Sequence, residues 1–232
     1  MKHKEIVIAK KKRKVFFSHF LLILIALTTL APFIWMVLTS LKPLQEVEML
    51  NPIPSDFKFD NYPKVFEQIP FARYYFNSLF VASWVTFLTC LTSAMAAYSF
   101  ARLQWKARDT VFKLYLTTLM IPGVVTMIPN YVLMVKLQFL DSYTGLILPA
   151  SFSAFGTFLL RQFMLSIPPA LDEAASIDGA SKWQIFWDLI LPLTRPGIIA
   201  LAIFVFLGNY GSFYWPLIII KSEHLRTLPV GM

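Results

Sequence analysis

The sequence predicts an all-α protein, a polytopic bundle of transmembrane helices with five spans. Hydrophobic residues make up 57% of the 232 residues and charged residues only 15%, which is more apolar than a soluble domain tolerates. Five stretches contain no Asp, Glu, Lys or Arg, and each can hold the roughly 20-residue helix that crosses about 30 Å of hydrocarbon. These stretches are residues 15–41, 74–101, 114–135, 142–160 and 196–220.

The apolar runs are continuous, whereas the strands of a membrane barrel are short and alternate polar with apolar residues, so helices are expected. No internal repeat, low-complexity tract or Pro/Gly/Ser-rich linker divides the chain, which favours one membrane domain. The single cysteine, Cys90, falls inside the second span, where packing explains it better than reactivity.

The first span follows a basic cluster at residues 10–14, and this cluster sets the expected topology. The apolar run behind it is too long for a signal peptide and lacks a cleavage site, so we expect a retained anchor. The cluster could bind nucleic acid, but the positive-inside rule explains it better and places residues 1–14 in the cytoplasm. Alternation then puts residues 42–73, 136–141 and 221–232 outside, and residues 102–113 and 161–195 inside.

Local signals predict where the chain turns and bends. The external connection at residues 42–73 is rich in proline and mixed charge, so we expect an ordered loop with short turns. In the second span, the small residues of "SAMAAYSFA" let helices approach closely. In the third span, Pro122, Gly123 and Pro129 predict a kinked or interrupted helix. Such a bend suits a solute pathway, but static bundles have bends as well, and both readings stay open.

Polar residues interrupt the fifth span at "FLGNYGSFYWPL", where Asn209 and Tyr210 lie among apolar neighbours. A buried amide in a bilayer either pairs with a neighbouring helix or contacts a solute. The residues alone leave both roles open for Asn209.

Between the fourth and fifth apolar stretches, an amphipathic insert predicts two short helices. Two prolines at residues 168–169 suit a first helical turn, and the acidic Asp172 and Glu173 favour the positive end of a helix. Gly179 can adopt the left-handed conformation that ends helices, so the first helix is expected over residues 170–178.

The second helix of the insert is expected to begin with a capping box formed by Ser181 and Gln184. It should end before Pro192, because a residue preceding proline avoids the α region. A two-helix insert of this kind suits either a groove in a partner protein or the surface of the lipid, and we leave both open. Its expected apolar stripe consists of Trp183, Phe186, Trp187, Ile190 and Leu191.

The stretch "EAASIDGASKWQIFWDLILPL", residues 173–193, resembles the EAA loop of bacterial ABC importer permeases. The early "TSLKP", "NYPKVF" and "YYFNSL" are similar to the MalG-like subunit of carbohydrate uptake systems in particular. The resemblance implies the type I ABC importer permease fold. It also implies that this loop couples the membrane helices to an ATPase through Glu173, Ala174, Ala175, Ile177, Asp178, Gly179 and Ala180.

Among these residues, the resemblance implies that Glu173 meets a basic or polar group of the ATPase. Ala174 and Ala175 would allow close approach, and Gly179 would permit the turn. In the fifth span, Asn209 and Tyr210 become candidate positions on a solute path, although this chain lacks the Trp-Asn-acidic-aromatic run of many relatives.

The implied partners are a MalF-like second permease subunit, a cytoplasmic ABC ATPase dimer, an extracellular or periplasmic solute-binding protein and the lipid bilayer of a bacterial inner membrane. No nucleic acid and no cofactor is implied. Family members usually have six spans, so we expect the chain to be truncated at "RTLPVGM" with the sixth span missing. The expected division is residues 1–14 cytoplasmic, 15–41 first span, 42–73 external loop, 74–220 permease core with the EAA loop at 166–195, and 221–232 external end.

Other classes of function fit less well. The three histidines are scattered, no metal-ligand spacing or nucleophile motif occurs, and no phosphate-binding loop is present, so an enzyme is disfavoured and ATP hydrolysis is expected on a separate chain. A secondary transporter is the stronger alternative, but the five spans carry no Asp, Glu, Lys or Arg for ion coupling. A scaffolding membrane protein would have no reason to carry the EAA pattern.

Overall fold

The structure is a computed structural model that describes residues 2–232, with side chains from residue 15 onward. Every regular element in this described part is a helix, as the composition predicts. The chain forms two compact units, residues 1–69 and residues 70–232, which are considered separately below.

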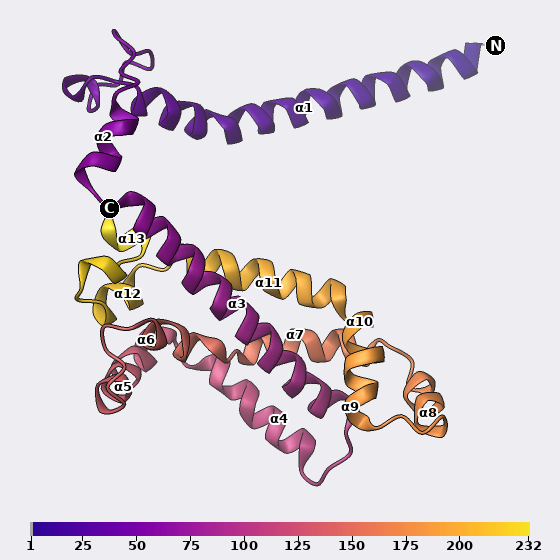
Figure 1. Cartoon of the computed structure of the whole chain (residues 1–232). Coiled ribbons are helices and arrows are strands. Elements are labelled where there is room, and N and C mark those ends of the chain that lie inside the picture. Colours follow the sequence, from indigo (N-terminus) through magenta and orange to yellow (C-terminus); the bar gives the residue numbers. More distant parts are fainter. Residues whose placement is uncertain (1) are drawn as a thin grey trace. The chain divides into compact units, whose positions relative to one another are not determined.

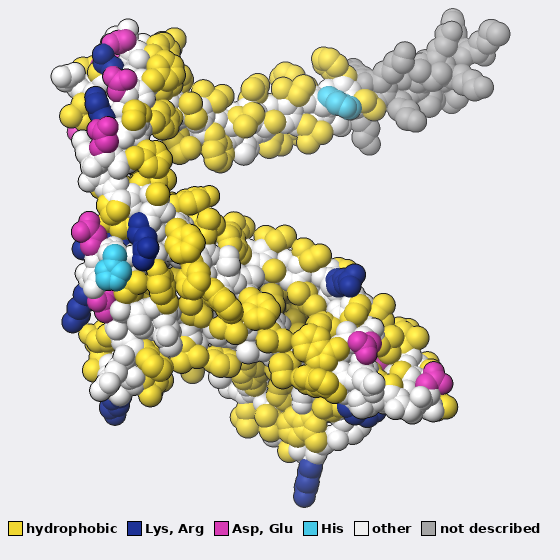
Figure 2. All heavy atoms as spheres, viewed as in Figure 1, with side chains coloured by type: hydrophobic (Ala, Val, Ile, Leu, Met, Phe, Trp, Pro, Cys, Tyr) yellow, Lys and Arg dark blue, Asp and Glu magenta, His cyan; other side chains and the backbone are white. Residues whose placement is uncertain are grey.

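The N-terminal unit contains a long helix, a loop and a short helix, namely α1 (Lys2–Ser40), η1 (Leu44–Glu46) and α2 (Asn61–Gln68) (Figure 1). Residues 15–40 of α1 form an apolar span, and none of their most apolar window is buried in the protein. Hydrophobic side chains cover the visible face of this helix in Figure 2. The side chains of the basic cluster at residues 10–14 lie outside the described ones.

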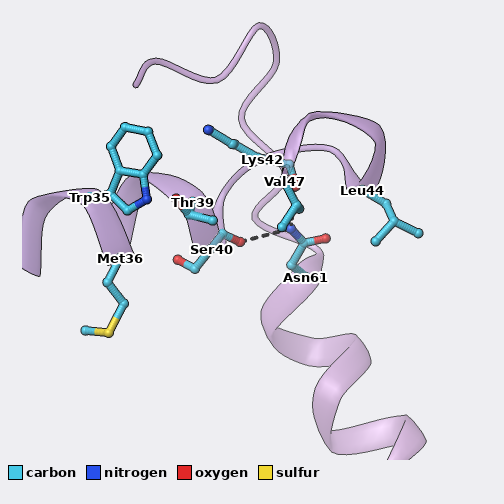
Figure 3. A pocket seen from close by; sticks show the side chains of 8 residues that line it. All are labelled: Trp35, Met36, Thr39, Ser40, Lys42, Leu44, Val47 and Asn61. Atoms are coloured by element: carbon cyan, nitrogen blue, oxygen red, sulfur yellow. Dashed lines mark hydrogen bonds between the residues drawn. The ribbon is translucent and has the colours of Figure 1, made fainter. Parts of the chain in front are cut away.

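The loop after α1 is ordered by side chains that bind main-chain carbonyls. The Asn61 amide donates hydrogen bonds to the Ser40 and Lys42 carbonyl oxygens, at 2.9 and 3.0 Å. Lys42 is only 1% exposed, and its ammonium donates to the Met49 carbonyl at 3.1 Å and lies 4.9 Å from the ring centre of Trp35. These groups border a pocket of about 620 Å³ (Figure 3). The expected ordered loop is therefore confirmed.

The core of the second unit is built on α3 (Phe71–Arg102), against which α7 (Ala154–Leu165) and α11 (Arg195–Tyr210) pack (Figure 1). Small residues allow this packing, as the sequence predicts. A Cβ added to Gly156 of α7 would lie 2.6 Å from the Ser93 hydroxyl oxygen of α3, and one added to Gly197 of α11 would lie 2.6 Å from the Phe163 ring. The three helices are therefore in close contact at positions where no larger residue fits.

The third predicted span is interrupted where the sequence indicates. It consists of α4 (Arg108–Thr117), η2 (Thr118–Met120) and α5 (Gly123–Lys136), and the chain bends by 100° between η2 and α5. Pro122 precedes the bend with an extended backbone, because its ring prevents the helix from continuing. Pro129 is accommodated inside α5.

The five predicted spans are not five straight helices. In the described residues, α1 and α3 are long and apolar enough to cross a membrane alone, and five spans result only if three bent helix pairs each count as one. The fourth span combines α6 (Tyr143–Ile147), η3 (Pro149–Ser151) and α7, with a bend of 44°. The fifth predicted stretch, residues 196–220, is broken after Tyr210 and resumes as α12 (Tyr214–Ile219).

The last residues fold back over the first turns of α3. This terminal strap, residues 221–231, contains η5 (Glu223–Leu225) and α13 (Leu228–Gly231). The Asn77 amide of α3 donates to the carbonyl oxygens of His224 and Arg226 at 2.9 and 2.8 Å, and its oxygen accepts a hydrogen bond from the Tyr143 hydroxyl at 2.7 Å. Asn77 is fully buried with its polar groups engaged.

Asp141 holds the beginning of the strap. Its carboxylate accepts hydrogen bonds from the main-chain N–H groups of Lys221 and Ser222, both at 2.9 Å, and from the Ser222 hydroxyl. These hydrogen bonds, above all the one from the Ser222 side chain, lower the pKa of Asp141 because they favour the charged form.

Candidate functional site

The amphipathic insert folds as two short helices around Gly179, and residues 170–193 are called the hairpin below. The first helix, α8 (Ala170–Ile177), ends one residue before the expected end at residue 178. Gly179 has φ +85°, the left-handed conformation predicted for it, and the Ala180 N–H closes the turn on the Ala175 carbonyl at 2.9 Å. A Cβ would meet no neighbour at Gly179, so the backbone conformation alone requires glycine.

The second helix begins with the predicted capping box but ends later than predicted. The Ser181 hydroxyl accepts from the Gln184 N–H, and the Gln184 side chain accepts from the Ser181 N–H at 2.8 Å. The helix then continues through α9 (Lys182–Gln184), the π-helix η4 (Ile185–Ile190) and α10 (Leu191–Leu193). The expected end before Pro192 is wrong, because the wide π turns change the hydrogen-bond pattern and Pro192 enters the first turn of a new α segment.

The apolar side chains of the second helix divide between the core and the surface. Ile185, Phe186 and Ile190 are at most 2% exposed, whereas Trp183 is 58% exposed and Trp187 is 38% exposed. Of the expected apolar stripe, Phe186 and Ile190 are thus buried in the core, whereas Trp183 and Trp187 lie on the surface of the hairpin. Their rings instead flank the ring of Phe186, at 5.7 and 5.0 Å between ring centres.

The hairpin presents part of the EAA-like set on its surface. Ala175 and Ala180 are half-buried against the helical core. Ile177 is 86% exposed, although it is a large apolar residue. The remaining members are also exposed, namely Glu173, Ala174, Asp178 and Gly179.

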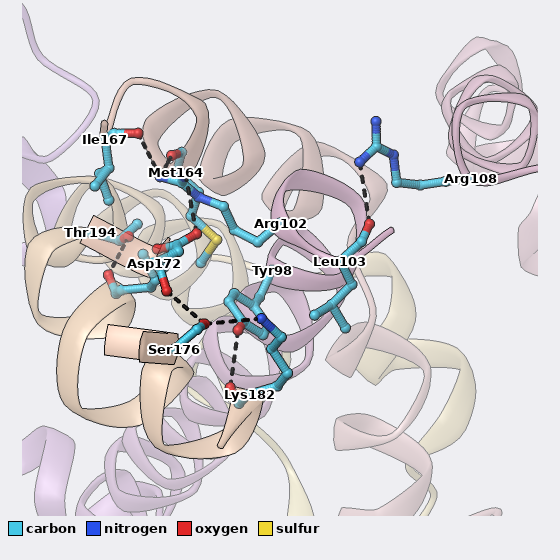
Figure 4. Close-up of polar contacts among 11 residues, drawn as sticks. Tyr98, Arg102, Leu103, Arg108, Met164, Ile167, Asp172, Ser176, Lys182 and Thr194 are labelled. Atoms are coloured by element: carbon cyan, nitrogen blue, oxygen red, sulfur yellow. Dashed lines mark hydrogen bonds and ion pairs between the residues drawn. The ribbon is translucent and has the colours of Figure 1, made fainter. Parts of the chain in front are cut away.

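The last turns of α3 hold the hairpin through two residues that the sequence does not single out (Figure 4). The Arg102 guanidinium donates to the carbonyl oxygens of Met164 and Ile167, at 2.6 and 2.7 Å, and lies 3.3 Å from the Asp172 carboxylate. The Tyr98 hydroxyl donates to the Lys182 carbonyl at 3.0 Å. The helix α3 therefore makes polar contacts with both halves of the hairpin.

A pocket of about 640 Å³ lies beside these contacts, between the end of α3 and α8. Its wall includes the Arg102–Asp172 pair and Glu173. Within the hairpin, the Ser176 hydroxyl donates to the Asp172 carbonyl at 2.7 Å, and the Lys182 ammonium donates to that hydroxyl at 3.3 Å. The pocket is thus lined by polar groups that belong to both helices of the hairpin and to α3.

The second candidate region, around Asn209 and Tyr210, lies at the end of α11. The Asn209 amide donates to the Val205 carbonyl of its own helix at 2.8 Å, and the Tyr210 ring stacks on Phe206. The helix ends at Tyr210, and a pocket of about 860 Å³ lies between the residues after this end and the start of α5. It is lined by Gly123, Val124, Met127, Asn130, Gly211, Ser212, Phe213, Tyr214 and Trp215.

One aromatic residue of this pocket is held in place, because the Trp215 indole N–H donates to the Gly145 carbonyl at 3.0 Å. The Asn130 and Ser212 side chains make no hydrogen bond within the part of the chain that the structure describes. Across residues 15–232, no three His, Cys, Asp or Glu side chains group so as to hold a metal ion.

The family model of the binding-protein-dependent transport system inner membrane component matches residues 89–230, a range that contains the hairpin and the two pockets described above. The chain belongs to this family. It is therefore a permease-type membrane component of an ABC importer, as predicted from the resemblance of residues 173–193 to the EAA loop of such permeases.

Relatives over nearly the whole chain carry permease names. The arabinooligosaccharides transport system permease protein AraQ of Bacillus subtilis is 36% identical over 215 residues, which cover 90% of this chain and 76% of the relative. The lactose transport system permease protein LacG of Rhizobium radiobacter is 33% identical, with 88% of this chain and 75% of the relative covered. The sn-glycerol-3-phosphate permease protein UgpE of Yersinia enterocolitica is 33% identical, with 93% and 80% covered.

A solved structure shows the same fold. A chain of a bacterial ABC transporter involved in the import of the acidic polysaccharide alginate matches with a TM-score of 0.81 and 24% identity, covering 93% of this chain and 76% of that chain. The predicted permease fold is therefore confirmed.

Proposed function

We propose that this permease subunit forms the membrane path for a sugar or an oligosaccharide, together with a second, MalF-like permease subunit. A dimer of ABC ATPases on the cytoplasmic side would drive the transport, and an external solute-binding protein would deliver the solute. Two of the relatives carry the names of oligosaccharide and lactose permeases, which supports a carbohydrate as the substrate. ATP hydrolysis is assigned to the separate ATPase chains.

The hairpin is the proposed contact with the ATPase. Its exposed apolar residues, Ile177 and Trp183, have the character of anchors that enter a groove in a partner protein. The acidic Glu173 is exposed on the same helix as Ile177, so it can meet a basic or polar group of the ATPase. The exposed surface of this well-ordered hairpin is the observation that carries the proposal.

The proposal includes a topology with the N-terminus in the cytoplasm. It retains the expected division of the chain and places the hairpin, within residues 166–195, on the same cytoplasmic side. A reporter enzyme fused after Lys182 should give a cytoplasmic signal, whereas a signal from the opposite face of the membrane would invert the map.

The solute path is proposed to pass the end of α11, near Asn209 and Tyr210, and the adjoining pocket of about 860 Å³. Its exposed Tyr214 ring and the Asn130 and Ser212 side chains combine an aromatic face with hydrogen-bonding groups, as saccharide recognition requires. Within a membrane, the Asn130 and Ser212 side chains, which are unpaired among the described residues, are more stable beside a water-filled cavity than against lipid, which also supports a solute path here.

The direct test is reconstitution of this chain with the second permease subunit and the ATPase in proteoliposomes. Uptake of labelled lactose, maltose and arabinotriose should require ATP and the solute-binding protein. ATP-dependent uptake of glycerol 3-phosphate alone would change the assigned substrate class, and uptake that runs without the ATPase would refute the proposal.

A further inference from the structure

Two polar contacts attach the hairpin to a helix that is not its neighbour along the chain. Along the chain, the hairpin lies between α7 and α11. In space, its polar attachments come from the last turns of α3, where Arg102 reaches α8 through Asp172 and Tyr98 reaches α9 through the Lys182 carbonyl. A displacement of either half of the hairpin therefore acts on α3 directly.

From these contacts we infer that α3 is the spanning helix that receives the motion of the hairpin, and that Arg102 and Asp172 are the positioning residues that transmit it. The inference rests on the proposed function, because the motion is the one that the ATPase would impose on the hairpin. It adds a defined route from that contact into the membrane helices.

Burial makes the Arg102–Asp172 pair a firm joint. The two side chains are 7% and 19% exposed, so solvent screens their attraction less than it screens a surface pair. Removal of one partner would leave the other charge buried and uncompensated, which costs far more than the loss of an exposed ion pair. In addition, Arg102 is anchored to the end of α7 through two carbonyl oxygens, so it cannot follow α8 freely.

The pair rests on a single contact. One guanidinium nitrogen, Nη1, lies 3.3 Å from one carboxylate oxygen, while Arg102 Nε and Asp172 Oδ1 are buried and have no hydrogen-bond partner. Nε faces the opposite side of the guanidinium from Nη1, so these two nitrogens cannot bind one carboxylate together. A shift of α8 away from α3 would therefore break the contact in one step.

The neighbouring pocket lies between the end of α3 and α8, so such a shift would widen it. The intact pair is one state of the joint, and a state in which α8 has shifted and the pair is broken is the other. Closure of the ATPase on the hairpin selects between them, since a coupling element needs two discrete arrangements that a distant site can bias.

The chain carries its own probe for the test. Cys90 is its single cysteine and lies, partly exposed, within α3. The complete transporter is treated with N-ethylmaleimide with and without trapping of the ATPase by ATP and vanadate, and alkylation of the Cys90 peptide is followed by mass spectrometry. In the wild-type complex, the alkylation rate should change on trapping.

Two variants test the joint, and a third serves as their control. Asp172→Asn keeps the shape but removes the charge, and Arg102→Lys keeps the charge but loses the planar guanidinium that joins Asp172 to the Met164 and Ile167 carbonyls. In both, the effect of trapping on alkylation should shrink by roughly two- to thirtyfold, the range over which coupling residues act. Asp109→Asn breaks the pairs with Arg108 and Arg161, in which Asp109 is 65% exposed, and should respond like the wild type.

The alkylation rate of Cys90 is measured per assembled complex, so a variant that assembles poorly does not distort the comparison. A wild-type Cys90 that does not respond to trapping, or an Asp172→Asn complex that responds fully, would overturn the inference. Equal losses in Asp172→Asn and Asp109→Asn would overturn it as well. Failure of the ATPase to assemble with the wild-type chain would instead refute the proposed function, which separates the two failures.

Discussion

The two ends of α3 each bind main-chain carbonyls with a buried polar side chain, yet they do so in opposite ways. In the first turns, Asn77 uses its amide and its oxygen in three hydrogen bonds, and the terminal strap is fixed to it. In the last turn, Arg102 holds the hairpin but leaves one of its donors unpaired, and Asp172 leaves one of its acceptors unpaired. A saturated network specifies one arrangement, whereas an unsaturated one leaves a second arrangement within reach.

The comparison predicts that changes near Asn77 reduce stability, whereas changes in the hairpin reduce coupling. The largest effect is expected for Asn77→Leu, which removes three hydrogen bonds and takes their partner from the Arg226 carbonyl and the Tyr143 hydroxyl, while the His224 carbonyl keeps its bond from Arg73. The free energy of unfolding should fall by about 3 kcal/mol, since each bond contributes about 1 kcal/mol. Thermal unfolding of the purified subunit measures this. Asn130→Leu is the matched control, because the Asn130 amide makes no hydrogen bond within the described residues; equal losses in the two variants would contradict the comparison.

The next effect concerns the exposed surface of the hairpin. Trp183→Ala should weaken the affinity for the ATPase by about 2 kcal/mol, as expected when an aromatic anchor leaves an interface, while the melting temperature stays near that of the wild type. Titration of the ATPase onto the membrane subunits in nanodiscs measures the affinity. An unchanged affinity combined with weaker binding to lipid would show instead that Trp183 lies on the membrane surface.

A smaller effect is expected for Gly179→Ala. An alanine at φ +85° is strained by about 1 kcal/mol, and this strain acts on the turn between the two halves of the hairpin. Solute uptake per ATP hydrolysed should fall in reconstituted transporters, with normal insertion into the membrane. Gly208→Ala, at a glycine where a Cβ also meets no neighbour but φ is not positive, should leave the ratio of uptake to hydrolysis unchanged.

The smallest effect is a dependence on pH at the strap. The pKa of Asp141 is lowered in the folded protein, so its contribution to stability is complete above its ordinary value of 3.8 and is lost as the pH falls through the lowered value. Between pH 6 and pH 3, the melting temperature of wild type should therefore fall more than that of Asp141→Asn. Parallel curves would show that the strap does not depend on this carboxylate.

Sequence alone predicts the parts of the hairpin that depend on neighbouring residues. The first helix, the turn at Gly179 and the capping box of Ser181 each follow from a local signal within a few residues. The interruption at Pro122 is predicted for the same reason, because proline acts on its own turn.

The rest depends on contacts between distant parts of the chain. Arg102 looks like a topology signal at the end of a span, and nothing near it in sequence indicates that it binds Asp172 or the end of α7. The π-helix at Ile185–Ile190 lies in the amphipathic insert, where helical spacing does not tell an α-helix from a π-helix. The break after Tyr210 lies in an apolar stretch, where hydropathy indicates a span but not the continuity of its helix.

The glycine contacts of the core have a consequence for how the subunit can move. Gly156 brings α7 against Ser93 of α3, and Gly197 brings α11 against Phe163 of α7. The three helices are therefore packed closely at these two positions. Sliding one past another would force atoms into overlap. A push on the end of α3 is therefore expected to tilt this trio as a solid block, and a gate for solute would open along its outer boundary and not through its middle.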